Sequence, residues 1–252
     1  MKRSQRSPAL LAALLLPALL AGCGGDKSTE ANGGDPISFP IAIGTTWVYS
    51  VTTSSTDLAA ESDTTRIIGT ETVDGKTWYV FVDHSSGDTT LARQEGQSFY
   101  VFPSSEDGGT GGDENPFVAY LGRVLENSLP WKYADFGAAA GASWTLVEAE
   151  TTFALDIGGV PYEASVEVSF RCASGGRTTV SVPAGTYADA YRGEIAQRIV
   201  FTTPAGADTV TSESSYWIAD GVGVVKRDEV NSDPFEGVTE TRTEALESYD
   251  LR

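Results

Sequence analysis

The sequence predicts a mainly β fold, arranged as an antiparallel barrel, half-barrel or sandwich with one short amphipathic helix. From residue 39 onward, short runs of alternating apolar and polar residues recur, separated by glycine-rich turns. The chain contains 27 glycines and a single methionine, and segments with helical periodicity are scarce. Roughly ten to twelve strands joined by short turns are expected from this pattern.

The first half of the body contains five expected strands. They span residues 47–51, 64–73, 77–82, 89–94 and 98–102. Asp74-Gly75, between the second and third strands, is typical of a two-residue hairpin turn. Trp47 and Tyr49 share one face of the first strand, so both are expected in the core.

The second half contains seven further expected strands. They span residues 144–157, 162–172, 178–182, 190–202, 209–218, 223–230 and 236–249. Gly158-Gly159 and Pro183-Ala184-Gly185 are turn sequences, and Gly185 suits a positive φ. Gly221-Val222-Gly223 predicts a bulge or a close approach of another segment to the backbone.

Residues 116–128 are the one expected helix. Apolar residues recur there with helical spacing, Pro116 suits the first helical position, and Asn115 can cap it. We expect this helix to lie against the sheet. A loop rich in glycine and acidic residues, 104–115, precedes it.

The N-terminus reads as a secretory signal that ends in a lipidation site. Lys2, Arg3 and Arg6 precede the apolar segment 9–21, which is shorter than the ~20 residues of a membrane-spanning helix. The run Leu20-Ala21-Gly22-Cys23 resembles the lipobox of bacterial lipoproteins. The expected organisation is therefore a removed signal (1–22), a lipidated Cys23 with a flexible tether (23–36), and a single β-rich domain (37–252).

The lipobox resemblance implies that Cys23 is the first mature residue. Its thiol would carry a diacylglycerol and its amino group a further acyl chain such as palmitate. One chain binds a membrane only marginally, whereas two or more anchor a protein stably. The residue directly after Cys23 is Gly24. In the lipoproteins that the lipobox resembles, an aspartate at this position favours the inner membrane, so the resemblance implies anchorage in the outer membrane of the cell envelope.

Charge and cysteine content narrow the expected partners. Without the three basic residues of the signal, 14 basic residues remain against 35 acidic ones, a net charge of −21. This excess opposes binding to nucleic acid, so the membrane reached through Cys23 is the one expected partner. Cys172 alternates with Val166, Val168 and Phe170, which predicts a buried structural thiol.

The remaining polar residues form no recognisable catalytic or metal site. His84 is the only histidine and lies in an expected hairpin loop, so we assign it no catalytic role. The acidic loop 106–114 lacks the ligand spacing of an EF-hand, which leaves calcium binding there open. The five tryptophans are expected mainly in the core rather than in a ligand cleft. No catalytic, metal-binding or cofactor-binding residue and no cofactor are expected.

Two short patterns look alike: Gly44-Thr45-Thr46-Trp47 and Gly141-Ala142-Ser143-Trp144. Four residues do not establish a repeat. The favoured explanation is convergence, in which a turn followed by a strand that begins with an aromatic residue arises independently at the two places.

Three longer segments carry a family resemblance. They are F-P-x-x-x-G-x-x-W-x-Y at 39–49, P-A-G-T-Y at 183–187, and W-x-A-x-G-V-G-x-V-K at 217–226. In order and rough spacing they resemble a group of uncharacterised bacterial secreted lipoproteins. The resemblance supports the fold, and the group has no established activity to carry over.

The sequence therefore favours a non-enzymatic, lipid-anchored lipoprotein of the cell envelope with a binding or structural role. One alternative is a carrier that holds a hydrophobic ligand in a half-barrel cavity. A second alternative is an envelope hydrolase, for which no motif is present. The ligand or protein partner is left open.

Overall fold

A computed structural model describes residues 35–54, 61–104, 122, 124–125, 127–157, 160–233 and 237–252. Twelve antiparallel strands form one continuous sheet in the order β6-β5-β4-β3-β2-β1-β12-β11-β10-β9-β8-β7. The mainly β, antiparallel fold class is thus confirmed. Because all twelve strands belong to one sheet, the fold is a curled barrel rather than a sandwich.

The strands of the first half are shorter than most of those in the second. They are β1 (Thr46–Thr53), β2 (Glu61–Val73), β3 (Lys76–Asp83), β4 (Thr89–Glu95), β5 (Ser98–Ser104) and β6 (Trp131–Asp135). The second half comprises β7 (Ser143–Ile157), β8 (Val160–Val182), β9 (Gly185–Thr203), β10 (Gly206–Ala219), β11 (Gly223–Asp233) and β12 (Val238–Asp250).

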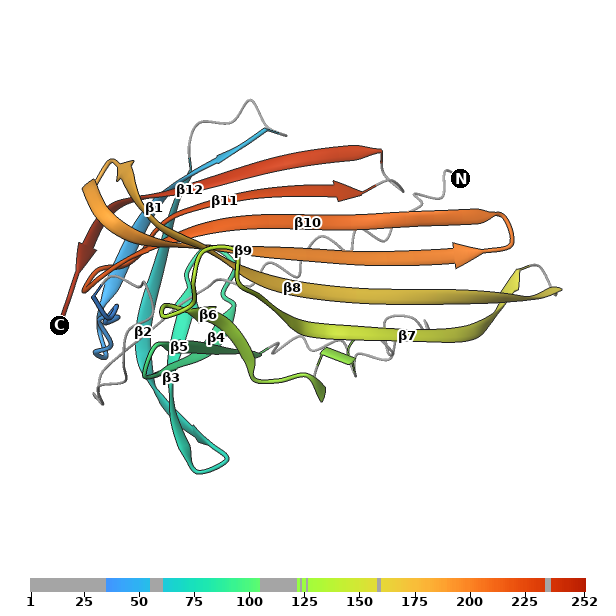
Figure 1. Ribbon diagram of the computed structural model, residues 1–252, viewed down its shortest axis with the longest axis horizontal. Helices are drawn as coiled ribbons and strands as arrows, with labels where there is room; N and C mark the ends of the chain where they lie inside the picture. The colour runs from blue at the N-terminus through green and yellow to red at the C-terminus, as the bar shows by residue number, and fades with distance from the viewer. Residues whose placement is uncertain are drawn as a thin grey trace, which may run out of the picture.

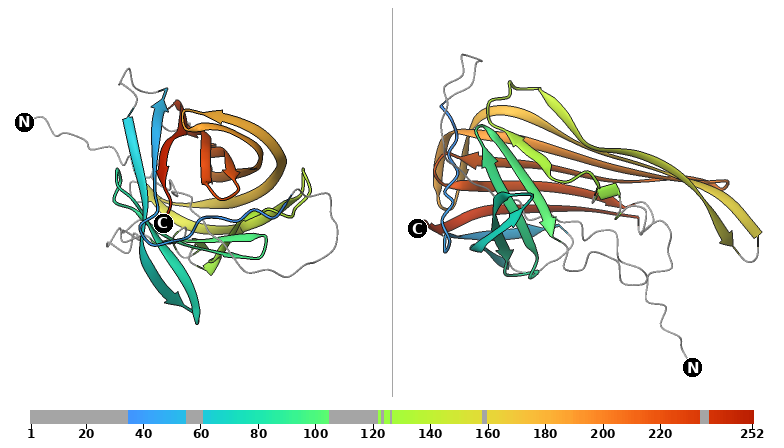
Figure 2. Two further views of the ribbon diagram at one scale, coloured as in Figure 1. Left: turned by 90° about the vertical axis from the view of Figure 1, so that its left-hand side faces the viewer. Right: turned by 90° about the horizontal axis from the view of Figure 1, so that it is seen from below.

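The sheet consists of two six-stranded meanders, β1–β6 and β7–β12, joined by pairing of β1 with β12. Figure 1 shows the long strands of the second meander side by side, and the left panel of Figure 2 shows the sheet curling around an axis. The edge strands β6 and β7 are not neighbours in the sheet, so the barrel is incompletely closed.

The barrel has two ends, which we call the near end and the far end. The near end carries residues 35–45, the turns after β8 and β10, and the C-terminal residues 250–252. The far end carries the turn after β9, the last residues of β7 and β11, and the first residues of β8 and β12. In Figure 1 the near end lies at the left, where the C-terminus is marked.

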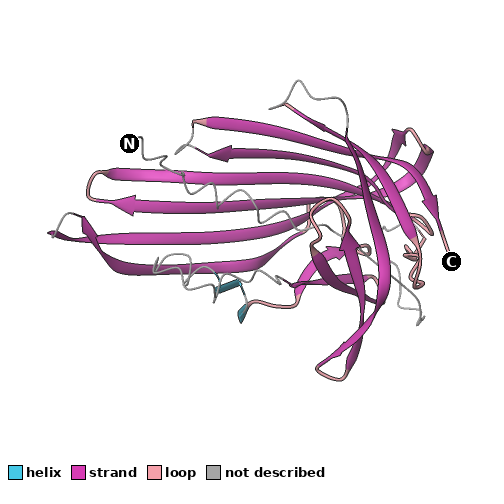
Figure 3. Cartoon of the chain, turned by 180° about the vertical axis from the view of Figure 1, so that it is seen from behind, coloured by secondary structure: helices cyan, strands magenta, loops and turns pink. Residues whose placement is uncertain are grey.

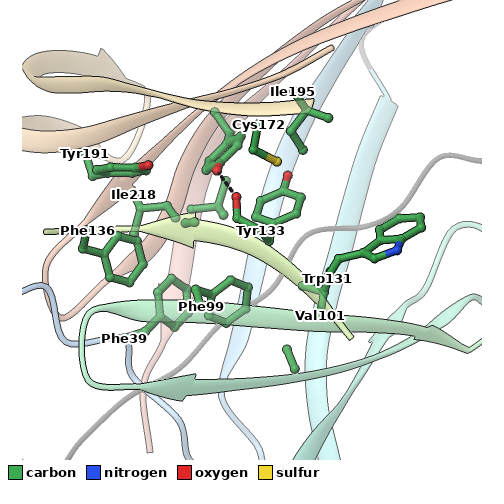
Figure 4. Close-up of a cluster of buried hydrophobic side chains, with 14 of the residues drawn as sticks. Phe39, Phe99, Val101, Trp131, Tyr133, Phe136, Cys172, Tyr191, Ile195 and Ile218 are labelled. Atoms are coloured by element: carbon green, nitrogen blue, oxygen red, sulfur yellow. Dashed lines mark hydrogen bonds between the residues drawn. The ribbon is translucent and has the colours of Figure 1, made fainter. Parts of the chain in front are cut away.

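The core lies on the inner face of the sheet, as alternation along the strands predicts. Trp47 and Tyr49 are buried there, which confirms that prediction. Aromatic side chains from both meanders meet in this core: Tyr133 of β6 lies 4.6 Å from Tyr216 of β10 between ring centroids. The Tyr216 hydroxyl donates a hydrogen bond of 2.7 Å to the Tyr133 carbonyl (Figure 4).

Residues 35–39 form a strap across the near end. The Asp35 carbonyl accepts a hydrogen bond from Arg177 of β8 (3.1 Å), and the Ile37 carbonyl accepts one from Gln94 of β4 (2.8 Å). Ser38 bonds to the turn between β10 and β11. Because Ile37 and Phe39 are only 1% and 2% exposed, the strap belongs to the core.

The two Gly-x-x-Trp patterns occupy equivalent places in the two meanders. The Gly44 amide donates to the carbonyl of Ile67 on β2 (2.8 Å), and the Gly141 amide donates to that of Ser174 on β8 (2.7 Å). Ile67 and Ser174 donate back to the residue after each glycine, at 3.0 and 2.8 Å. The two turns therefore share one backbone hydrogen-bond pattern with the neighbouring strand.

One strand was not predicted, and two predicted elements differ from the structure or are only partly described. The short strand β6 was not expected. The two strands expected at 162–172 and 178–182 are one strand, β8, because the register shift between Ser174 and Gly176 absorbs the glycines as a bulge. Of the expected helix 116–128, residues 122, 124, 125 and 127 are helical, and Val124 and Leu125 pack against the core (Figure 3).

The predicted turns are found where they are described. Pro183 and Ala184 form the turn after β8, and Gly185 has φ 147°. Gly223 has φ 109°, and a Cβ at that position would lie 2.3 Å from Cζ of Phe39. The close approach predicted for this glycine is therefore the packing of the strap on β11.

Candidate functional site

The inner face carries a row of charged side chains, which we call the inner ionic network. It crosses β11, β12, β2 and β3 beside the core. Its members are Asp63, Asp83, Arg227, Glu229, Arg242 and Glu244. Charged groups at this depth are rare unless they are paired, so the network is the most distinctive polar feature of the described residues.

Arg242 on β12 joins two carboxylates of the network. One guanidinium nitrogen lies 2.8 Å from Glu244, and the same nitrogen lies 3.7 Å from Asp63. The Arg242 side chain keeps a quarter of its surface exposed, whereas those of Glu244 and Asp63 keep 14% and 6%. The arginine therefore compensates two acids that are largely removed from water.

Asp63 and Asp83 form a carboxyl pair between β2 and the end of β3. Burial, together with the hydrogen bond and negative charge of Asp83, raises the pKa of Asp63 to about 6. Burial also opposes ionisation of Asp83. Its pKa is nevertheless lowered, because the Ser85 and Ser86 amides and the Ser85 hydroxyl donate hydrogen bonds to it. The pair therefore holds one proton at mildly acidic pH, below about 6, and loses it as the pH rises toward neutrality.

Arg227 and Glu229 of β11 form the other end of the network. Arg227 lies 3.7 Å from Glu244 and also bonds to the hydroxyl of Tyr133, and these contacts raise its pKa despite burial. Glu229 accepts hydrogen bonds from Ser212 (3.4 Å) and Asn231 (3.0 Å). Each charge in the network therefore has a polar partner within the protein.

This arrangement is better suited to holding strands together than to chemistry. The carboxylates are bound by arginines or hydrogen-bond donors, and no cysteine or histidine lies in the network. Within the described ranges, no three His, Cys, Asp or Glu side chains are grouped to hold a metal ion.

A depression of about 550 Å³ lies on strands β7, β8 and β9. Most of the side chains that line it alternate with the core residues of these strands, so they belong to the outer face. Glu150 and Glu167 are paired across β7 and β8 in this depression, and Glu148 forms an exposed ion pair with Arg171 (3.2 Å). Five of the nine residues that line it are charged.

The structure places the other candidate residues as follows. Cys172 is 1% exposed on the inner face of β8, and burial raises its pKa to about 12, which confirms a buried structural thiol. His84 is exposed in the turn between β3 and β4, where the sequence predicted it. Trp47, Trp78 and Trp131 are buried, and Trp144 and Trp217 are partly buried.

Trp78 and Trp217 depart from a simple core position. Trp78 lies in a second small cluster with Val80 and Leu91, and the guanidinium of Arg93 lies 4.8 Å from its ring centroid. Trp217 has the ammonium of Lys226 4.8 Å from its ring centroid. Neither ring lines an apolar cleft.

Cys23, most of the tether 23–36 and the acidic loop 106–114 lie outside the described residues. Their predicted roles therefore remain predictions. No helix in the described part of the chain has the length and apolar character needed to span a bilayer.

No protein-family profile matches the chain, and no curated protein sequence is similar to it. Three solved structures are similar at low level. A candidate lipoprotein from Parabacteroides distasonis has 14% identity and a TM-score of 0.37, and the match covers 86% of this chain and 100% of that one. A candidate exported protein with a YmcC-like fold from Bacteroides fragilis has 14% identity and a TM-score of 0.38, with 85% and 99% covered.

The hypothetical lipoprotein YmcC from Escherichia coli has 9% identity and a TM-score of 0.29, and the match covers 82% of this chain and 90% of that one. Likeness at this level establishes neither a shared family nor a shared function.

Proposed function

We propose that the protein is a lipoprotein of the bacterial cell envelope, anchored in the outer membrane by acyl chains on Cys23. Its barrel would have a non-enzymatic binding or structural role. The observation that carries the anchor is the run Leu20-Ala21-Gly22-Cys23 after a basic and then apolar N-terminus. The burial of Cys172 supports it, because Cys23 is then the one thiol of the chain left for modification.

The non-enzymatic role is supported by the state of the polar groups. The buried acids of the inner ionic network are paired with Arg227 and Arg242 or bound by hydroxyl and amide donors. A general base or nucleophile must be reached by its substrate, and Asp63, Asp83 and Glu229 are only 5%, 8% and 6% exposed.

The carrier alternative requires an apolar cavity on the inner face. The inner face is instead packed with aromatic side chains from both meanders, such as Phe99, Tyr133 and Tyr216 (Figure 4). The depression of about 550 Å³ lies on the outer face and is lined by charges. These features favour the binding or structural role over the carrier.

The anchor is tested by fractionating cells that make the Cys23→Ser variant. We expect this variant to leave the membrane fraction and to lose incorporation of labelled palmitate. The matched control is Cys172→Ser, which changes the same residue type but leaves the lipobox intact and should stay in the membrane. Unchanged fractionation of Cys23→Ser would remove the anchor from the account.

The role of the barrel is tested by native mass spectrometry of the protein purified without its acyl chains. The packed core predicts the mass of the polypeptide alone. A co-purifying apolar molecule would favour the carrier instead. A hydrolytic activity abolished by His84→Ala or Asp63→Asn would favour the hydrolase.

A further inference from the structure

Four large apolar side chains are exposed at the near end of the barrel. We call them the near-end patch. They are Ile43 (57% exposed), Ile68 (54%), Tyr249 (41%) and Leu251 (38%). Single exposed apolar residues are ordinary, but several of them at one end of a molecule indicate an interaction site.

Backbone contacts bring these four residues together. The Gly44 amide, next to Ile43, donates to the carbonyl of Ile67, next to Ile68 (2.8 Å). The Arg252 amide, next to Leu251, donates to the Thr45 hydroxyl (3.4 Å), and β12 places Tyr249 opposite Trp47. The patch is therefore built around the loop that leads into β1.

The same end of the barrel receives the chain from the proposed anchor. The strap begins at Asp35, whose carbonyl is held by Arg177 of β8. Eleven residues separate Cys23 from Asp35, and the segment of twelve residue-to-residue steps reaches about 40 Å when fully extended. As a flexible coil it would span only about 20 Å on average.

This reach limits how the barrel can stand on its membrane. From Arg177, strand β8 continues for 17 residues to Val160 at the far end, a distance of about 56 Å at ~3.3 Å per residue. A barrel standing on its far end would need a tether longer than the one available. It must therefore stand on its near end or lie on its side.

We infer that the near-end patch rests on the lipid bilayer in which the chain is anchored, so that the far end points away from the membrane. This inference rests on the proposed anchorage through Cys23. The near-end patch supplies the apolar side chains that contact the lipid. The exposed Arg66 lies beside Ile68 on β2. The strongly acidic remainder of the mature chain is repelled by anionic lipid, which disfavours the side-lying pose.

The orientation is tested with the mature chain from residue 23, carrying Cys23→Ser and a polyhistidine tag at its N-terminus. The tag binds nickel-chelating lipid in vesicles of phosphatidylethanolamine and phosphatidylglycerol. It replaces the acyl anchor at the same place, so the result does not depend on whether Cys23 is lipidated in cells. An environment-sensitive NBD fluorophore is attached to single cysteines, while the buried Cys172 stays unlabelled.

Probes at Ile43→Cys and Ile68→Cys report on the patch, and probes at Tyr162→Cys and Val238→Cys are the matched controls. Tyr162 and Val238 have similar exposures, 37% and 45%, but lie at the far end. On addition of vesicles we expect the emission at positions 43 and 68 to rise about twofold or more and to shift to the blue. The emission at positions 162 and 238 should stay unchanged.

Three results would overturn the inference. Equal responses at all four positions would show a barrel that lies on its side. No response at positions 43 and 68 would show that the patch does not touch lipid. A response at these positions without vesicles that grows with protein concentration would show that a second copy covers the patch. Unchanged membrane fractionation of Cys23→Ser, with the vesicle result as expected, would be a failure of the proposed function instead.

Discussion

Gly193 is the glycine at which the packed core leaves the least space for an added side chain. It lies on β9 opposite Tyr216 of β10, and a Cβ at this position would lie 2.1 Å from Cζ and 2.2 Å from the hydroxyl oxygen of Tyr216. The ring has no room to move away, because Tyr216 is fully buried and its hydroxyl is bonded to the Tyr133 carbonyl. We therefore expect Gly193→Ala to displace the ring and break this hydrogen bond.

The expected cost combines overpacking, about 1–3 kcal/mol, with a buried hydrogen bond, about 1–3 kcal/mol. Because alanine lowers the conformational entropy of the unfolded chain relative to glycine, it also stabilises the protein by about 0.4–1 kcal/mol, which offsets part of this cost. The free energy of unfolding should thus fall by about 1–5 kcal/mol in urea denaturation followed by circular dichroism.

Gly69→Ala is the matched control for this experiment. Gly69 also lies in a strand, but a Cβ there meets no atom within 4 Å. Its unfolding midpoint should stay close to that of the parent. In a Tyr216→Leu background, which lacks the clashing atoms, the cost of Gly193→Ala should shrink. A Gly193→Ala protein as stable as the parent would refute the packing described for the core.

Three further predictions concern the buried polar groups. Because the pKa of Asp63 is raised to about 6, the native state binds more protons than the unfolded state between about pH 4 and 6, and the stability that Asp63 contributes is lost as the pH rises through this window. Asp63→Asn should therefore flatten the pH dependence of the urea midpoint between these values. A pH profile that the substitution leaves unaltered would contradict the raised pKa. Arg242→Met should lower the free energy of unfolding by about 2–3 kcal/mol, since it removes the arginine that pairs with Asp63 and leaves Glu244 with Arg227 alone. The outer Arg171→Met should cost under about 1 kcal/mol. Cys172 should react with a maleimide only after unfolding, as measured by mass spectrometry of the labelled protein. Rapid labelling of the native protein would show instead that β8 opens locally.

Local patterns were enough to predict most of the strands. Alternation and turn glycines located β1, β3 and β10 closely, and Gly223 was identified as a point of close approach. The strand β6 was missed because its five residues, Trp131–Asp135, show little alternation: three of them are buried on a strand at the sheet edge. The bulge in β8 was missed because its glycines look like a turn when the partner strand is unknown.

The inner ionic network could not be predicted from local sequence. Asp63 and Arg242 are 179 residues apart and meet only because β1 pairs with both β2 and β12. The one available signal was the placement of Arg227, Glu229, Arg242 and Glu244 at alternate positions within strands. Alternation alone does not say which face is buried, and charged residues are assigned to solvent by default.

The shared pattern of the two Gly-x-x-Trp turns was hidden for a similar reason. The strap residue Phe39 and Phe136 stand at the same distance before Gly44 and Gly141, but the intervening residues differ. The shared feature is a pattern of backbone hydrogen bonds, which constrains glycine and aromatic positions and leaves the rest of the sequence free.

The most direct test of the account is the intact mass of the protein extracted in detergent from cells that make the full chain. Anchorage through Cys23 predicts a polypeptide of residues 23–252 that carries a diacylglycerol and a further acyl chain, with Cys23 as its first residue. A chain that retains Met1, or one that begins at another residue and carries an unmodified Cys23, would contradict it.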